Sequence, residues 1–204
     1  TGSSPEFGIW ALIIGTLKIT VIATIVAVPI GLGAAIYLNE YASDRSRRII
    51  KPILEILAGI PTIVFGFFAL TFVTPILRNL IPNLGEFNSI SPGIVVGIMI
   101  VPMITSMSED AMSSVPDKIR EGAFGLGATK FEVATKVVLP AATSGVVASI
   151  VLGISRAIGE TMIVSLAAGS SPTSSLSLTS SIQTMTGYIV EIATGDAAFG
   201  SDIY

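Results

Sequence analysis

Two side chains of opposite charge lie in one of the most apolar stretches of the chain. Arg156 and Glu160 occur in the segment GISRAIGETM, and neither positions 137–155 nor positions 161–190 carry a charged residue. Ionisable residues in such stretches are costly in a membrane and usually functional. Because positions i and i+4 share one face of a helix, two readings follow. The pair either neutralises itself as a helix-packing ion pair or forms a charged face that a polar solute meets.

Several chemistries are absent from the chain. The sequence has no cysteine and no histidine, which excludes disulfides, thiolate nucleophiles and the commonest general base and metal ligand. Gly122 and Gly127 have the spacing of a phosphate-binding loop, but Ala128 stands where that loop needs lysine. We therefore expect no catalytic residue, no metal site, no bound cofactor and no nucleic-acid partner. Any ATP would be used by another chain.

The composition indicates a membrane protein. Of the 204 residues, 51% are hydrophobic and 12% are charged, against about 25% charged residues in soluble domains. The chain begins TGSSPEFG, without Met or a basic segment, so we expect no signal peptide and an internal fragment. The expected fold class is a polytopic all-α membrane protein with one transmembrane domain over residues 1–204.

Four stretches are long and apolar enough to cross a bilayer, which takes about 20 residues. They cover about residues 10–38, 53–77, 90–110 and 137–168. Prolines within them are tolerated because neighbouring groups in a membrane protein can satisfy the freed backbone. The fourth stretch contains the arginine–glutamate pair, which we therefore expect on one helix inside the membrane.

The charges of the connecting loops predict the orientation of these stretches. Loops 39–51 and 113–136 hold eight of the eleven Lys and Arg residues, whereas the alternating segments 79–89 and 169–181 hold none. By the positive-inside rule the two basic loops are cytoplasmic and the tail 169–204 is external. The apolar segment 182–193 is too short to cross and is predicted to be an external or re-entrant helix.

Three further charges lie in or at the ends of the predicted spans. Lys18 is at the edge of the uncharged run 19–38, from which it can extend towards the headgroups, and the sequence assigns it no function. Glu109 and Asp110 lie at the cytoplasmic end of the third stretch. We expect helix-end or loop contacts for these two acids, and the alternative is a part in coupling to a partner.

The loop 113–136 is patterned as two short helices rather than as a plain connector. The segments SVPD (114–117) and TKFE (129–132) each fit a capping box, which begins a helix. Glycines interrupt the pattern between them, the last being Gly127. We expect a helix pair joined by a glycine elbow, which suits docking in a groove of a soluble partner.

This loop resembles the EAA loop of permease subunits of bacterial ABC importers. That motif reads EAA-x3-G-x9-I-x-LP, and the same spacing is present here. The matching residues are Glu121, Gly122, Ala123, Gly127, Leu139 and Pro140. Gly122 replaces the alanine at the second position of the motif, and Val137 replaces the isoleucine. The resemblance implies that about residues 118–131 contact a cytoplasmic ATPase subunit.

The flanking segments extend the resemblance over almost the whole chain. Residues 35–70 and the segment SRAIGETM are similar to phosphate-importer permeases of the Pst type, most of all to the C-type subunit. The resemblance implies a permease core of the type I importer kind with about four of its five spans, in the bacterial inner membrane. It also implies three kinds of partner: a second permease subunit, cytoplasmic ATP-binding subunits and an external phosphate-binding protein.

The resemblance places Arg156 and Glu160 on a phosphate path. The arginine fork can bind two phosphate oxygens, and the glutamate can hold the arginine or accept a hydrogen bond from protonated phosphate. One alternative is an ABC importer for another oxyanion or polar solute. The other is a channel or secondary transporter without an ATPase; secondary transporters often show inverted repeats, and none is visible here.

Overall fold

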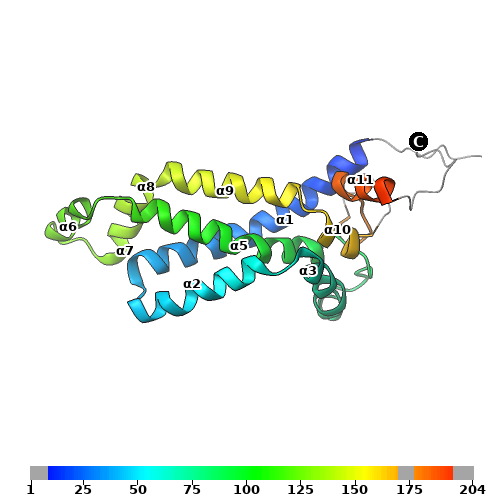
Figure 1. Cartoon of the computed structure of the whole chain (residues 1–204), viewed down its shortest axis with the longest axis horizontal. Helices are drawn as coiled ribbons and strands as arrows, with labels where there is room; N and C mark the ends of the chain where they lie inside the picture. Colours follow the sequence, from blue (N-terminus) through cyan, green and yellow to red (C-terminus); the bar gives the residue numbers. More distant parts are fainter. Residues whose placement is uncertain (1–8, 170–176, 195–204) are drawn as a thin grey trace, which may run out of the picture. The chain divides into compact units, whose positions relative to one another are not determined.

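The computed structural model describes residues 9–169 and 177–194, which form helices with no strand among them (Figure 1). The all-α prediction is therefore confirmed. The chain divides into two compact units. Unit 1 contains residues up to Ala23, Pro61–Gly97 and the residues from Ala157; unit 2 contains Thr24–Ile60 and Ile98–Arg156. Two long helices, α1 and α5, each contribute residues to both units.

Three helical stretches in the described residues are long and apolar enough to span a membrane. α1 (Ile9–Ile36) continues into the π-helical η1 (Tyr37–Tyr41). The second stretch consists of α3 (Thr62–Phe68), π-helical η2 (Ala69–Val73) and α4 (Thr74–Leu80), and the third is α5 (Ile90–Ser113). α1 is mostly apolar, which is typical of a helix surrounded by lipid or protein. Its one charged residue, Lys18, is buried and donates from Nζ to the Ser177 carbonyl oxygen at 2.9 Å, so the predicted extension to the headgroups is wrong.

The predicted span 53–77 is not one helix, which corrects the expectation from hydropathy. α2 (Asp44–Gly59) ends before Pro61, and α3 begins after it. A residue that precedes proline is driven to extended backbone, and Ile60 has φ −67° and ψ 129°. The apolar run is therefore divided between two helices, and α2 also takes up the end of the predicted loop 39–51.

The predicted span 137–168 is broken twice. The pieces are α7 (Lys130–Glu132), π-helical η3 (Val133–Val138), α8 (Leu139–Ala141), α9 (Thr143–Ile158) and α10 (Met162–Ala167). A bend of 75° separates α8 from α9. Pro140 lacks a backbone N–H, which weakens the helix there. Thr143 Oγ1 donates to the carbonyl oxygens of Leu139 and Pro140 at 3.1 and 2.8 Å, which satisfies groups freed by the bend.

Unit 2 is held together by close contact of α1, α5 and α9. Ile104 of α5 fills the space beside Gly31 of α1 and Gly153 of α9. A Cβ atom at either glycine would lie 2.9 Å from the Ile104 side chain. The hydroxyls of Ser108 and Ser149 form a buried hydrogen bond of 2.7 Å between α5 and α9. Small residues and interhelical hydroxyl bonds of this kind are typical of membrane helix packing.

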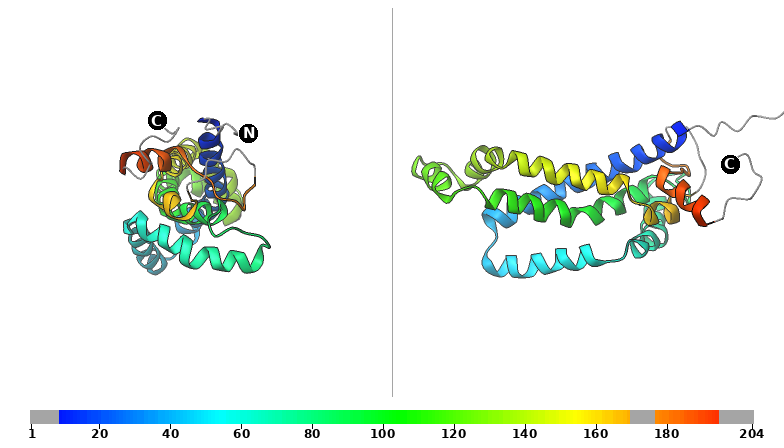
Figure 2. Two further views of the ribbon diagram at one scale, coloured as in Figure 1. Left: turned by 90° about the vertical axis from the view of Figure 1, so that its right-hand side faces the viewer. Right: turned by 45° about the horizontal axis from the view of Figure 1, so that its top comes forward.

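Unit 1 uses the same kind of packing. Gly66 of α3 lies against Leu166 of α10, and a Cβ at Gly93 of α5 would lie 2.7 Å from Ile22 of α1. Glycine at these two positions lets the helix backbones approach closely. The arrangement of α3, α4 and α10 is visible in the two views of Figure 2.

The C-terminal tail is described over residues 177–194 only. α11 (Met185–Thr194) lies where a short helix is predicted at 182–193, so the helix is confirmed and its external location stays a prediction. Met185 N–H donates to Thr16 Oγ1 at 3.1 Å, which ties α11 to the start of α1. The rest of the predicted external tail, residues 170–176 and 195–204, lies outside the described residues.

Candidate functional site

The basic loop 113–136 folds as two short helices separated by a glycine turn, as predicted (Figure 1). The helices are α6 (Asp117–Gly125) and α7 (Lys130–Glu132). Gly127 between them has a φ of 85°, in the left-handed region that side chains disfavour. Thr129 and Glu132 form a complete capping box, because each accepts a hydrogen bond from the backbone N–H of the other. We call residues 113–136 the α6–α7 loop.

The capping box predicted at 114–117 is wrong. Pro116 precedes α6 and offers no side-chain hydrogen bond. The Ser114 hydroxyl instead donates to the carbonyl oxygen of Ala111 at 2.7 Å. This acceptor is available because the last carbonyl groups of a helix have no partner within that helix. Ser114 therefore ends α5 and does not begin α6.

The residues of the EAA-like motif divide between the core of unit 2 and its surface. The core there is a hydrophobic cluster of Ala35, Met112, Val115, Val133, Val138, Ala142 and Val146. Ala123 and Leu139 pack against this cluster. The exposed motif residues are Glu121, Gly122, Gly127 and Pro140. A Cβ at Gly122 would meet nothing within 4 Å, so the alanine of the motif would fit at this position.

Arg120 anchors the loop through a network that local sequence patterns do not reveal. Its guanidinium donates to the Met112 carbonyl oxygen at 2.7 Å and to Asn39 Oδ1 at 3.2 Å, and lies 3.6 Å from the Glu40 carboxylate. Asn39 in turn donates to Ser113 Oγ at 2.8 Å. The network joins α6, η1 and the end of α5. Asn39 lies 81 positions before Arg120, so no short-range spacing predicts their contact.

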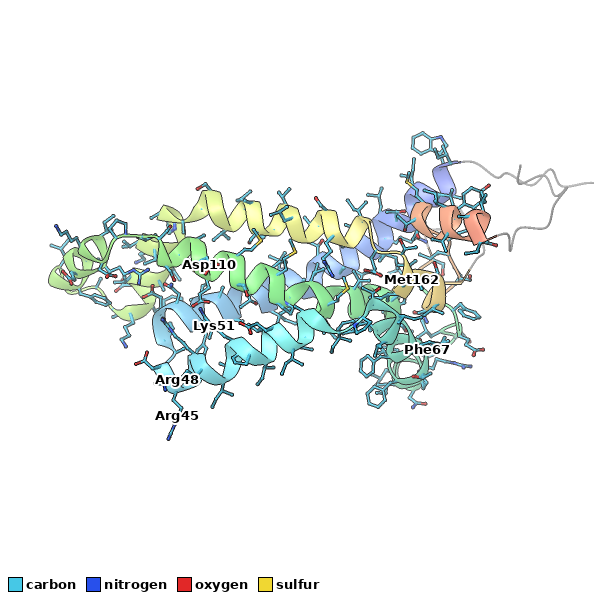
Figure 3. The ribbon with its side chains drawn as sticks, in the orientation of Figure 1. Arg45, Arg48, Lys51, Phe67, Asp110 and Met162 are labelled. Carbon is cyan, nitrogen blue, oxygen red and sulfur yellow. The ribbon has the colours of Figure 1, made fainter. Side chains whose placement is uncertain are left out.

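Two basic residues fasten α2 to the same end of unit 2. Arg47 donates from Nε and Nη2 to two carbonyl oxygens of η1, both at 2.9 Å. Lys51 forms an ion pair of 2.9 Å with Glu109, whose side chain is buried. The helix-end contact predicted for Glu109 is therefore confirmed, whereas its neighbour Asp110 is exposed (Figure 3).

The α6–α7 loop carries exposed apolar side chains between exposed basic ones. The apolar residues are Ile119, Phe124, Leu126 and Phe131, and the flanking basic residues are Lys118 and Lys130. Leu126, at the tip of the turn, is 92% exposed. We call the four apolar side chains the loop patch. Exposed apolar groups gathered in this way mark a contact with another protein or with a membrane.

Arg156 and Glu160 do not share a helical face, which corrects the expectation from their spacing. α9 ends at Ile158, so Arg156 lies in its last turn and Glu160 lies beyond it. Gly159, a weak helix former, follows the last helical residue. Arg156 is exposed and is the last residue of unit 2, whereas Glu160 is buried and belongs to unit 1.

Glu160 is used at the start of the next helix. Its Oε1 accepts a hydrogen bond from the N–H of Ile163 at 3.3 Å. Its backbone carbonyl accepts one from Thr186 Oγ1 at 3.1 Å. An acceptor at this position satisfies a free amide of α10, whose first residue is Met162 (Figure 3). The carboxylate therefore has a structural use that its sequence context does not predict.

Unit 1 contains a small polar pocket between α10 and α11. It has a volume of about 150 Å³ and is lined by Val164, Ser165, Gly169, Gln183, Thr184, Gly187, Val190, Glu191 and Thr194. Ser165 Oγ is buried without a hydrogen-bond partner, and Gln183 donates to Glu191. The lining offers hydroxyls and a carboxylate but no basic side chain, so it suits water better than an anion. No group of three potential metal ligands occurs in the described residues.

Comparison with known proteins identifies transport-system relatives. Residues 27–200 match the model of a family described as "Binding-protein-dependent transport system inner membrane component". The chain is 38% identical over 170 residues to the probable ABC transporter permease protein YqgH of Bacillus subtilis, with 83% of this chain and 55% of that protein covered. It is 38% identical over 185 residues to the phosphate transport system permease protein PstC of Haemophilus influenzae, with 81% and 59% covered. The chain thus spans little more than half the length of these relatives.

Among solved structures, the fold is similar to that of a chain of the MetNI methionine ABC transporter in inward-facing conformations. The TM-score is 0.63, the sequence identity is 23%, and the alignment covers 78% of this chain and 74% of that chain. At this identity the likeness concerns the fold alone. It agrees with the all-α fold class predicted from the sequence.

Proposed function

Because the chain belongs to the family of binding-protein-dependent transport system inner membrane components, we propose that it is a permease subunit of an ATP-driven importer of inorganic phosphate. The family membership confirms the resemblance drawn from the EAA spacing. The family consists of components of transport systems in the inner membrane, which are not enzymes. The observation that carries the phosphate assignment is the 38% identity to a phosphate permease, PstC of Haemophilus influenzae.

The α6–α7 loop is the proposed docking site for a cytoplasmic ATPase subunit. Three features support this role: the exposed loop patch, the fixed turn at Gly127 and the anchoring of α6 through Arg120. A push on α6 would reach η1 and the end of α5 directly, because Arg120 bonds to both. Ala123 and Leu139 would transmit the same movement through the hydrophobic cluster of unit 2. Glu121, Gly122 and Pro140 complete the proposed coupling surface.

Arg156 is the proposed phosphate contact. It is exposed in the last turn of α9 and forms no ion pair with another described residue of unit 2. A free guanidinium can bind two oxygens of one phosphate. Glu160 is the second proposed residue of the path. Its Oε1 is used by α10, and its other oxygen can accept a hydrogen bond from a protonated phosphate, which sulfate at neutral pH cannot supply.

The partners of the proposed importer follow from this assignment. A second permease subunit completes the membrane pathway, ATP-binding subunits in the cytoplasm hydrolyse ATP, and an external phosphate-binding protein delivers the solute. This chain would bind no cofactor itself. The large apolar side chains exposed along α1, such as Trp10 and Ile25, are suited to contact with lipid or with the second permease subunit.

Uptake by the full-length transporter tests the proposal. Proteoliposomes that contain the permease pair and its ATPase, loaded with ATP, should accumulate radiolabelled phosphate when binding protein is added outside. Excess sulfate should not compete. Accumulation of sulfate or of another solute in place of phosphate would favour an importer for that solute. Phosphate entry without ATP or the ATPase would contradict the importer mechanism and favour a channel or secondary transporter.

A further inference from the structure

The basic residues of α2 divide into two pairs. Arg47 and Lys51 are used inside the protein, by the carbonyl oxygens of η1 and by Glu109. Arg45 and Arg48 are exposed and form no hydrogen bond or ion pair within the described part of the chain. Figure 3 shows both side chains at the N-terminal end of α2, directed away from the other helices of unit 2. The second pair is therefore available to bind a ligand.

An apolar stripe follows the two free arginines along the same helix face. Ile49, Ile53 and Ile56 are all more than half exposed, at helical spacings from Arg45, whereas Leu54 is buried on the opposite face. From Ile49 to Ile56 the stripe is about 10 Å long, less than the roughly 15 Å of one hydrocarbon leaflet. Such a face, charged at one end and apolar along its length, fits the boundary between headgroups and acyl chains.

Two tyrosines independently mark the same boundary. Tyr37 and Tyr41 in η1 are each 44% exposed. Tyrosine is enriched where a membrane protein passes from hydrocarbon to headgroups. Arg47 bonds to the carbonyl oxygens of η1, so these tyrosines and the first turn of α2 belong to one locally fixed structure.

The acidic residues of α2 do not neutralise the free arginines. Asp44 and Glu55 form no ion pair within the described residues. Asp44 is in the first turn of α2, where a carboxylate is favoured by the helix dipole. Glu55 is about 10 Å further along the helix axis than Arg48. Residues 44–48 hold three arginines against the single carboxylate of Asp44, so positive charge remains at the start of the stripe.

We propose that Arg45 and Arg48 bind the headgroup of an anionic phospholipid, with an acyl chain lying along Ile49, Ile53 and Ile56. The planar guanidinium groups match the phosphate oxygens of such a headgroup, and anionic lipids attract exposed arginines near the membrane surface. The placement in the cytoplasmic leaflet rests on the topology of the proposed importer.

Lipid retention measures this binding directly. The full-length transporter is reconstituted in vesicles that contain equal amounts of phosphatidylethanolamine and phosphatidylglycerol, and is then extracted. Native mass spectrometry of the extracted transporter identifies the phospholipids that stay bound. Wild type should retain phosphatidylglycerol preferentially. Each arginine should contribute about fivefold to this preference, so that Arg45→Gln with Arg48→Gln lowers it about twenty-five-fold. Arg78→Gln, which removes an exposed arginine of α4, is the matched control and should change nothing. An unchanged preference in the double variant would overturn the proposal.

A photo-crosslinking residue at Ile53 identifies what covers the stripe. The proposal expects crosslinks to phospholipid in the assembled transporter. Crosslinks to another protein subunit would overturn it, because the face would then be a subunit interface. Both measurements read bound lipid and not transport. An importer for a different solute would therefore leave their outcome unchanged, whereas loss of lipid binding would leave the phosphate assignment intact.

Discussion

The α6–α7 loop and the connection between α9 and α10, residues 159–161, are held in different ways. In the loop, the capping box at Thr129 fixes the start of α7, Gly127 fixes the turn, and Arg120 bonds α6 to the Met112 carbonyl oxygen and to Asn39. In the connection, Glu160 is bonded to the start of α10, but Arg156 on its other side has no ion-pair partner within unit 2.

This difference is consistent with the two proposed roles, in which the loop transmits force from the ATPase and Arg156 meets the solute. A segment that is held by several hydrogen bonds to neighbouring elements is more rigid than one without them. An arginine without an internal partner keeps its hydrogen-bonding capacity for something outside the protein. The loop should therefore respond to mutations mainly through stability and docking, and Arg156 mainly through solute handling.

Arg120→Met should give the largest loss of stability. It removes charge-assisted hydrogen bonds to Met112 and Asn39 and leaves Glu40 without its cation, which should lower the free energy of unfolding by about 2–3 kcal/mol. Denaturant unfolding of the purified chain in micelles measures this change. The control is Lys136→Met, which breaks an exposed pair with Glu132 and should cost less than about 0.5 kcal/mol. Equal losses of unfolding free energy in the two variants would contradict the proposal that Arg120 anchors the loop.

Gly127→Val should disrupt docking without unfolding the protein. A left-handed residue with a β-branched side chain costs at least about 1–2 kcal/mol, so the turn should change shape. We expect a permease that stays in the membrane, releases its ATPase and takes up phosphate about tenfold more slowly. Pull-down of the ATPase and uptake assays measure these effects. Gly122→Ala, in open space, should behave as wild type. Normal uptake by Gly127→Val would mean that the loop is only a connector.

Arg156→Lys should reduce phosphate uptake several-fold while expression and unfolding stay as in wild type. Lysine keeps the charge and loses the two-pronged geometry that matches phosphate. Uptake measured at several phosphate concentrations should show an increased KM. The double variant Arg156→Gln with Glu160→Gln distinguishes the alternative. If the two residues only neutralise each other, uptake lost in either single variant should return, and such a rescue would decide against the substrate role.

Glu160→Gln should have the smallest effect of these substitutions on uptake, and comparing it with Glu160→Ala separates the two proposed roles of Glu160. Glu160→Gln keeps an acceptor for the Ile163 N–H and should leave the unfolding free energy almost unchanged. Glu160→Ala removes the acceptor and should cost about 1 kcal/mol. If Glu160→Gln retains stability but lets sulfate compete with phosphate, the carboxylate acts on the solute. If uptake and selectivity are normal, its role is limited to capping α10.

Several features that depend on neighbouring residues could be predicted from the sequence, although the capping box expected at 114–117 was wrong. The helix pair of the α6–α7 loop follows from the TKFE capping box and from glycine at position 127, both of which act over a single turn. The first and third spans could be predicted because each apolar run forms one continuous helical stretch. The second span was predicted too long, because hydropathy continues across Pro61 while the backbone does not.

Features that depend on distant residues could not be predicted in the same way. The anchoring role of Arg120 requires Asn39, which only the folded chain brings near. The shared face expected for Arg156 and Glu160 assumes an unbroken helix. Neither residue shows by its type that the helix ends at Ile158 and that the glutamate is used by the next one. The sequence therefore identifies candidate residues better than it predicts their contact partners and the helix boundaries around them.

The position of Ile104 between Gly31 and Gly153 has an evolutionary consequence. One side chain fills the space beside both glycines, so the three positions share a single volume. A methyl group gained at position 31 or 153 has to be balanced by a smaller residue at 104, because packed interiors tolerate volume exchange better than volume gain. These positions should therefore change in concert among descendants of this chain. In an alignment of related sequences, linked changes at positions 31, 104 and 153 would show that α1, α5 and α9 meet at this point.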